Sequence, residues 1–234
     1  MNQRRSRRCA TRASGSDVAR DLDGSVIAVL GGGTGGLGAP ITTALEARGA
    51  TVVAVSRTSE PAIDIRDVTA GDQLLTLVTE QHGRLDGVVN ATGIVAFGNL
   101  VDTDDVVIEE LFLTNVLGPL WLTRRVAPAL GETKGFIVSI SGVVAETPMP
   151  GMAAYSASKA ALAAGATALR RELRRIGVQV IDVRPPHTET GLASRPLAGT
   201  APKMPSGLDP AAVAERIVAA IEAGTDDLPS ADFT

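Results

Sequence analysis

The chain of 234 residues is 44% hydrophobic and 21% charged, so it is long enough for one domain with a sizeable core and too apolar for an intrinsically disordered protein. Its formal net charge of −4 combines a +5 segment over residues 1–20 with a body that carries −9, and so acidic a body argues against nucleic-acid binding. The single cysteine, Cys9, excludes an intrachain disulfide and a cysteine-based metal site, and we expect no metal.

The basic segment 1–20 holds six arginines and no following apolar run, which is unlike a secretion signal. We interpret it as a disordered arm, with contact to an anionic partner as the alternative. Residues 21–234 are predicted to form one domain, because neither a linker nor an internal repeat interrupts them. We find no segment with the apolar length of a membrane span and therefore expect a cytoplasmic protein without a membrane partner.

The first predicted strand, residues 25–30 (SVIAVL), runs into the glycine cluster GGGTGGLG, and a helix is predicted over residues 39–48. Small residues at such a turn let the backbone approach a pyrophosphate, whose charge the helix N-terminus favours. The spacing of Gly32, Gly36 and Gly38 therefore indicates a dinucleotide-binding loop. A tight turn without a ligand is the alternative, since it too requires glycine.

The second predicted strand, residues 51–56, ends at Ser56 and Arg57. In NAD-binding folds an acid at this point often accepts hydrogen bonds from the ribose hydroxyls. Arg57 instead offers a charge-assisted pairing with a 2′-phosphate. The sequence thus favours NADP(H), with NAD(H) still possible, and a solvated Arg57 is the alternative.

Strands and helices alternate along the rest of the chain. Helices are predicted over residues 71–82, 104–130, 152–176 and 209–223, the last capped by Asp209, and strands over residues 87–90, 136–141 and 178–183. This alternation predicts an α/β fold with a single Rossmann-type, doubly wound parallel sheet and helices on both faces. Residues 188–208 suit a lid or binding loop, and residues 228–233 a short final strand.

Tyr155 and Lys159 lie one turn apart on the same face of the predicted helix 152–176. A nearby ammonium stabilises a phenolate, so we expect Lys159 to lower the pKa of Tyr155 and to make it a general acid and base. An ordinary surface pair is the alternative, because this spacing is common on helices.

Together with the glycine loop, this pair makes the chain resemble the short-chain dehydrogenase/reductase family over about residues 22–223. The resemblance implies a nicotinamide cofactor, interconversion of a carbonyl and an alcohol, and a homodimer or homotetramer. Apolar residues beside the expected pocket favour a small apolar substrate. By the resemblance Asn115 would hold a proton-relay water, Tyr155 and Lys159 would be catalytic, and the cofactor contacts would be Gly32, Thr34, Gly35, Gly36, Leu37, Gly38, Arg57, Asp64, Ile65, Asn90, Ala91, Thr92, Tyr155, Lys159, Pro185, Thr188 and Thr190.

The chain departs from the family where a catalytic serine is expected, thirteen residues before the tyrosine, because Gly142 occupies that position. Ser141 is adjacent, but on a regular strand its side chain would point to the opposite face unless a bulge redirects it. Ser141 or the substrate loop would then supply the hydroxyl, or a backbone N–H or water would replace it. Otherwise the protein is a catalytically weak dinucleotide-binding regulator or scaffold. The chain also has only six residues between Arg57 and Asp64, where the family has a helix.

Overall fold

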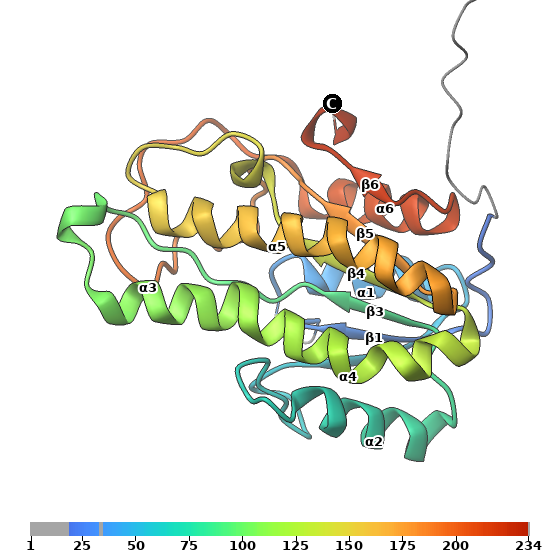
Figure 1. Ribbon diagram of the computed structural model, residues 1–234. Helices are drawn as coiled ribbons and strands as arrows, with labels where there is room; N and C mark the ends of the chain where they lie inside the picture. Colours follow the sequence, from blue (N-terminus) through green and yellow to red (C-terminus); the bar gives the residue numbers. More distant parts are fainter. Residues whose placement is uncertain (1–18, 33–34, 234) are drawn as a thin grey trace, which may run out of the picture.

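Six parallel strands form one sheet in the order β2-β1-β3-β4-β5-β6 (Figure 1). The structure, a computed structural model, describes residues 19–32 and 35–233. All five pairings are parallel, which confirms the predicted α/β fold with a single doubly wound sheet. The strands are β1 (Val26–Leu30), β2 (Thr51–Val55), β3 (Gly87–Asn90), β4 (Phe136–Ile140), β5 (Gln179–Val183) and β6 (Asp227–Leu228).

Helices cover both faces of the sheet because alternate strand residues point to opposite sides. On β1, Ile27 and Val29 pack against α1 (Gly38–Glu46) and α6 (Pro210–Glu222). Ala28 and Leu30 belong to a second core with α2 (Ala70–His82) and α4 (Gly118–Thr133). The 21-residue helix α5 (Ala153–Leu173) lies beside α4 on that second face (Figure 1).

The predicted helix 104–130 is divided into α3 (Asp105–Phe112), a π-helical turn (Leu113–Leu117) and α4. The wider turn places Asn115 at the point where the helix changes its hydrogen-bonding pattern, as is frequent at functional sites. Contrary to our expectation, the continuous segment Asp105–Thr133 is long and apolar enough, at a mean hydropathy of 1.3, to cross a membrane by length and composition. Half of its most apolar window is buried within the fold, which is typical of a core helix.

Three irregular regions matter for the cleft described below. No helix interrupts residues 56–69, as the short spacing between Arg57 and Asp64 predicts. Residues 188–208 contain a single bridge between Thr188 and Leu208. The predicted final strand shrinks to β6, because a 3-10 turn (Ser230–Phe233) follows it, whereas Asp209 caps α6 as predicted by accepting from Ala212 N at 3.1 Å.

Arg20, the last residue of the predicted arm, is bonded to the domain, while residues 1–18 lie outside the described residues. Its guanidinium carbon lies 5.1 Å from the centroid of the Phe136 ring, and its Nη2 donates to Lys134 O at 3.0 Å. Its backbone N–H donates to Glu222 O at 2.7 Å. Arg20 therefore packs against the domain, although the sequence placed it in the arm.

Candidate active site

A cleft of about 560 Å³ opens at the carboxyl ends of the strands. The sheet order reverses at β1, which lies between β2 and β3, and ligands of open α/β sheets bind at such a switch point. Of the predicted site residues, Gly32, Gly38, Asn90 and Asn115 lie behind the lining, and Thr34 lies outside the described residues. The lining includes Gly35, Gly36, Leu37, Arg57, Asp64, Ile65, Ala91, Thr92, Ser141, Tyr155, Lys159, Pro185, Thr188 and Thr190.

The described part of the glycine loop, residues 31–32 and 35–37 between β1 and α1, leaves room for an anion. A Cβ on Gly38 would lie 2.3 Å from Gly31 O, so only glycine allows α1 to start this close to the loop. Gly36 has a φ of +63° and open space where a side chain would stand. The first turn of α1 has neither a side-chain cap nor an acid, so its N–H groups and dipole are available to a pyrophosphate.

The edge of the cleft next to β2 carries two arginines, Arg57 and Arg66, beside Asp64. Asp64 is held by Arg66, whose Nη2 donates at 2.7 Å, and Arg66 Nη1 also donates to Glu110 of α3 at 3.1 Å. The hydrogen bonds from Arg66 are the largest cause of the lowered pKa of Asp64. Arg57 lines the cleft, is exposed and forms no ion pair among the described residues. Arg66 thus holds Asp64 by hydrogen bonds, whereas Arg57 acts on Asp64 through its charge and forms no hydrogen bond with it.

The residues that follow β3 and β5 shape turns at the centre of the cleft. Asn90 is buried, and its Oδ1 accepts from Thr92 Oγ1 at 2.5 Å and from Thr92 N at 3.2 Å. Thr188 Oγ1 donates to Pro186 O at 2.9 Å, and Thr190 Oγ1 accepts from Leu192 N at 3.4 Å. These side chains therefore hold loop backbone in place.

Asn115 ties the loop after β3 to the helix that carries the tyrosine. Its Oδ1 accepts from Ile94 N and its Nδ2 donates to Ile94 O, both at 3.0 Å. The Nδ2 also donates to Ser158 Oγ at 3.1 Å, and that hydroxyl donates to Tyr155 O at 2.7 Å. Asn115 thereby helps to position the backbone of Tyr155 through Ser158. Its predicted role in holding a relay water stays a prediction.

Lys159 is buried in the floor of the cleft. Its Nζ donates to Ile140 O, at the end of β4, at 2.8 Å. Burial disfavours the ammonium and lowers the pKa of Lys159 to about 8, while the nearby charge of Asp182 acts in the opposite direction.

Tyr155 is also buried, with 8% of its surface exposed. Burial disfavours the phenolate and raises the pKa of Tyr155 to about 12. Our expectation that Lys159 lowers the pKa of this tyrosine is therefore wrong for the ligand-free protein. Desolvation is the cause of the raised pKa of Tyr155, while the ammonium of Lys159 is bonded to Ile140 O.

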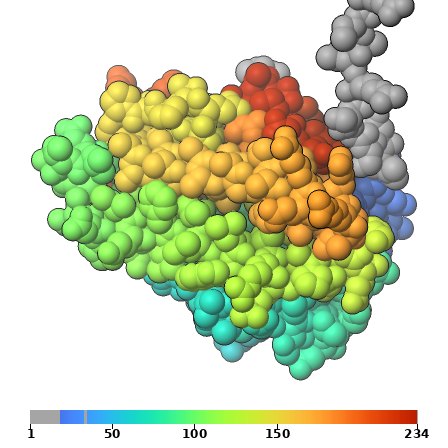
Figure 2. Space-filling view, viewed as in Figure 1, coloured from blue at the N-terminus to red at the C-terminus, as the bar shows by residue number. Residues whose placement is uncertain are grey.

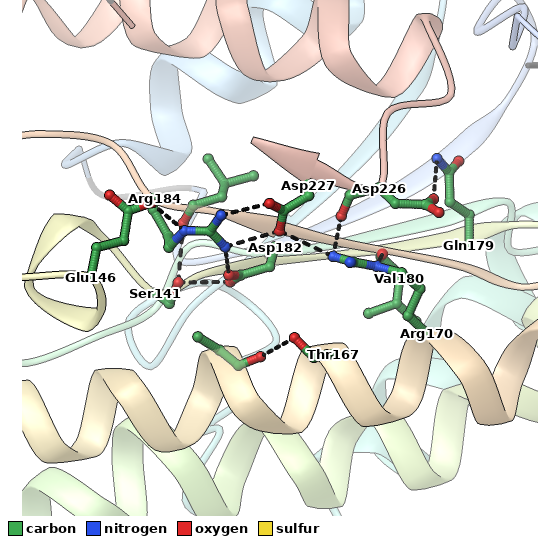
Figure 3. Close-up of polar contacts among 12 residues, drawn as sticks. Ser141, Glu146, Thr167, Arg170, Gln179, Val180, Asp182, Arg184, Asp226 and Asp227 are labelled. Atoms are coloured by element: carbon green, nitrogen blue, oxygen red, sulfur yellow. Dashed lines mark hydrogen bonds and ion pairs between the residues drawn. The ribbon is translucent and has the colours of Figure 1, made fainter. Parts of the chain in front are cut away.

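The end of β4 supplies no hydroxyl donor. Ser141 Oγ donates to Asp182 Oδ1 at 2.7 Å, so its single proton is used within the protein (Figure 3). Gly142 has a φ of +83° and a ψ of 164°, a backbone conformation essentially restricted to glycine. The catalytic role of Ser141 stays a prediction, and it would require this proton to leave Asp182.

An apolar wall faces the tyrosine. Val95, Phe97, Val144 and Met152 form a buried cluster with Tyr155. The irregular region 188–208 packs against this cluster, and Phe97 N donates to Ala198 O at 2.9 Å. This region thereby forms one side of the cleft.

Three residues at the site escaped the sequence analysis: Arg66, Ser158 and Asp182. Arg66 and Ser158 could not be predicted as site residues, because an arginine in a loop and a serine in a helix are common. Asp182 did carry a signal, because it is the single acid in the apolar run VQVIDV of a predicted buried strand. A buried acid must be paired, so its position indicated a partner.

The comparison with protein families decides the assignment. The model of the short chain dehydrogenase family matches residues 62–198. The chain belongs to the short chain dehydrogenase family. This confirms the resemblance drawn from its motifs.

Individual short chain dehydrogenases support the assignment. The chain is 32% identical over 189 residues to one of Pseudocercospora fijiensis, covering 71% of this chain and 61% of that protein. It is 33% identical over 207 residues to an uncharacterized oxidoreductase of Methylorubrum extorquens, covering 80% and 82%. A short chain dehydrogenase from Burkholderia cenocepacia, solved in complex with NADP, superimposes with a TM-score of 0.79 at 27% identity over 90% of both chains. The chain spans 61% of the length of the Pseudocercospora fijiensis protein, and 65% and 49% of the lengths of two other curated relatives.

Proposed function

We propose that the protein is an NADP(H)-dependent oxidoreductase that interconverts a carbonyl and an alcohol on a small, apolar substrate. One observation carries the proposal: a single cleft joins an open glycine loop, the Tyr155–Lys159 pair and an apolar wall. The family assignment supports a dehydrogenase or reductase, and the likeness to an NADP-bound structure supports a nicotinamide dinucleotide.

The cleft fits such a cofactor from the glycine loop to β5. The uncapped N-terminus of α1 and the open backbone at Gly36 would hold the pyrophosphate. The unpaired guanidinium of Arg57 favours a 2′-phosphate, and thus NADP(H) over NAD(H). Thr188 and Thr190 line the end next to Tyr155, where the nicotinamide would lie. When bound, the nicotinamide supplies or accepts the hydride.

The side chains of Tyr155 and Lys159 carry out the proton transfer. With its pKa raised to about 12, Tyr155 is a neutral phenol at neutral pH and can donate its proton to a carbonyl oxygen. In the reverse direction it must accept the proton of the alcohol, which requires a phenolate. Lys159 supplies a positive charge below about pH 8 that stabilises this phenolate once ligand contacts draw the ammonium from Ile140 O.

A second function is favoured by the end of β4. Ser141 is bonded to Asp182 and Gly142 has no side chain, so the usual hydroxyl beside the reacting carbonyl is missing. Loss of one such donor costs about 3 kcal/mol, or roughly a hundredfold in rate. A dinucleotide-binding regulator or scaffold with weak catalysis is therefore the alternative.

Two measurements separate these functions. Calorimetric titration with NADPH and with NADH tests nucleotide binding, and a panel of apolar ketones, aldehydes and alcohols tests turnover with NADPH and NADP⁺. Turnover that is lost in Tyr155→Phe, with NADPH binding retained, supports the enzyme. Tight NADPH binding without turnover on the whole panel supports the regulator. Absence of binding to either nucleotide contradicts both.

We also propose a cytoplasmic homodimer or homotetramer, without nucleic-acid or membrane partners. The face formed by α4 and α5 (Figure 2) is the candidate interface. Leu117 and Leu120 expose 42% and 38% of their surface there, and apolar side chains of this size suit an interface. Sedimentation of the protein and of Leu120→Glu tests this proposal: a monomeric wild type would contradict it.

A further inference from the structure

An ion-pair cluster that reaches from a buried carboxylate to the surface lies near the lysine, and the proposed chemistry does not use it directly. It consists of Arg184 and three carboxylates, those of Glu146, Asp182 and Asp227, and we call it the Arg184 cluster (Figure 3). The Arg184 side chain is only 13% exposed. Its Nε donates to Glu146 at 2.5 Å, its Nη2 to Asp227 at 2.7 Å, and its Nη1 to Asp182.

Asp182 connects this cluster to the catalytic lysine. It is the most buried carboxylate of the cluster, with 1% of its side chain exposed. Its Oδ1 accepts from Ser141 Oγ, and Ser141 directly follows Ile140, whose carbonyl accepts from Lys159 Nζ. On the adjacent strand Asp182 is in register with Ser139. The carboxylate therefore holds the strand end against which Lys159 is bonded.

The charges of the cluster do not cancel. One guanidinium faces three carboxylates, and Arg170, the further cation in contact, reaches Asp227 at 3.3 Å. This leaves an excess of one negative charge. A Cβ on Gly93 would lie 3.4 Å from Lys159 Nζ and 3.5 Å from Asn115 Oδ1, so the lysine and this neutral amide both face Gly93. Within the described chain, Asp182 is the charge that opposes the effect of burial on the pKa of Lys159.

We propose that Asp182 is a positioning residue that keeps Lys159 in its ammonium form and fixes the Ser141–Gly142 turn beneath the reacting groups. The inference rests on the proposed function, because a charged Lys159 serves catalysis only if Tyr155 transfers a proton. It explains why the Ser141 hydroxyl donates within the sheet although Ser141 lines the cleft, since the same carboxylate binds both Ser141 and Arg184.

The variant Asp182→Asn removes the negative charge of the side chain but keeps its size and shape. The amide oxygen can still accept from Ser141, whereas the negative charge is gone. The chain has three lysines, Lys134, Lys159 and Lys203, so the ¹³Cε signal of Lys159 can be assigned with Lys159→Met and titrated by NMR. We expect its midpoint to fall by about one pH unit or more in Asp182→Asn, as for a buried group that loses an opposite charge. The matched control Asp227→Asn removes a charge from the outer end of the same cluster and should leave the midpoint in place.

Turnover should follow the titration. In Asp182→Asn, kcat at neutral pH should fall and should recover as the pH is lowered and Lys159 gains its proton, which a merely structural defect would not produce. An unchanged Lys159 midpoint in a folded Asp182→Asn overturns the proposal. If that variant does not fold, the wild type decides, because a Lys159 midpoint below neutral pH would show that Asp182 does not keep the ammonium.

The NMR titration uses the protein without nucleotide or substrate, so it is independent of the proposed reaction. If the Lys159 midpoint falls as expected in Asp182→Asn but the protein shows no turnover, the effect of Asp182 on Lys159 is supported. The same result refutes the proposed oxidoreductase. If the protein turns over substrate but the Lys159 midpoint is unchanged in Asp182→Asn, the effect of Asp182 on Lys159 is refuted and the oxidoreductase is not.

Discussion

Ser141 Oγ donates its proton to Asp182 Oδ1 across 2.7 Å, from the end of β4 to the neighbouring strand β5. The hydroxyl closest in sequence to the family's serine position thus donates within the sheet, although Ser141 also lines the cleft. In the ligand-free protein this bond occupies the proton of Ser141, and Gly142 next to it has a glycine-specific backbone and no side chain.

The first prediction concerns Gly142→Ser, which places the family's serine at its usual position. At a φ of +83° and a ψ of 164° a side chain is strained, and we expect the variant to lose about 1–3 kcal/mol of unfolding free energy without gaining turnover. Urea denaturation and steady-state kinetics measure the two effects. Gly142→Ala is the matched control, because it has the same strain and no hydroxyl. Higher turnover in the serine variant alone would show that the turn adapts and that a donor was missing.

The second prediction concerns the ionisation of Tyr155, which is the single tyrosine of the chain. The phenolate absorbance of the ligand-free protein should therefore report this residue alone, with a midpoint near the raised pKa of about 12. Tyr155→Phe provides the baseline and should lower kcat by roughly 10²–10⁴ while NADPH still binds. A midpoint at or below 10, the ordinary value for tyrosine, would contradict the dominance of burial.

The third prediction concerns stability and pH. The pKa of Lys159 is about 8 in the folded protein and ordinarily 10.5, so between these values the unfolded chain binds more protons. The unfolding free energy should therefore rise with pH across this window, by about 3 kcal/mol in total. Above pH 10 the raised pKa of Tyr155 acts the other way, because the unfolded chain then loses its phenol proton first.

Denaturant unfolding at a series of pH values measures this dependence in the protein without nucleotide. Lys159→Met should flatten the rise between pH 8 and 10.5 and leave the fall above pH 10. The same rise in both proteins would assign it to other groups.

The fourth prediction concerns Arg57 and the choice of nucleotide. Removing a charged hydrogen-bond partner of a phosphate costs about 1.5–3 kcal/mol, so Arg57→Ala should bind NADPH roughly ten- to a hundredfold more weakly. Its affinity for NADH should stay unchanged, and calorimetry of both nucleotides measures the difference. Arg124→Ala, at an exposed position of α4, is the control for the loss of one positive charge. Equal losses for both nucleotides would contradict recognition of a 2′-phosphate by Arg57.

The order of strands and helices could be predicted because it depends on local patterns. Apolar runs such as SVIAVL and FIVSIS, separated by amphipathic segments, leave few arrangements other than a parallel sheet between helices. The glycine loop and the spacing of Tyr155 and Lys159 likewise depend on adjacent residues. The π-helical turn at Asn115 could not be predicted, because one extra residue in a helical turn leaves the apolar pattern almost unchanged.

By itself the sequence determined the fold class, the position of the cleft, and the tyrosine and lysine within it, since each follows from short-range spacing. Only the tertiary structure decided the ionisation of that pair and the role of Ser141. Burial raises the pKa of Tyr155. Asp182 accepts a hydrogen bond from Ser141, a residue 41 positions earlier in the chain. Desolvation and contacts between distant strands exist only once the chain is packed, and no local pattern encodes them.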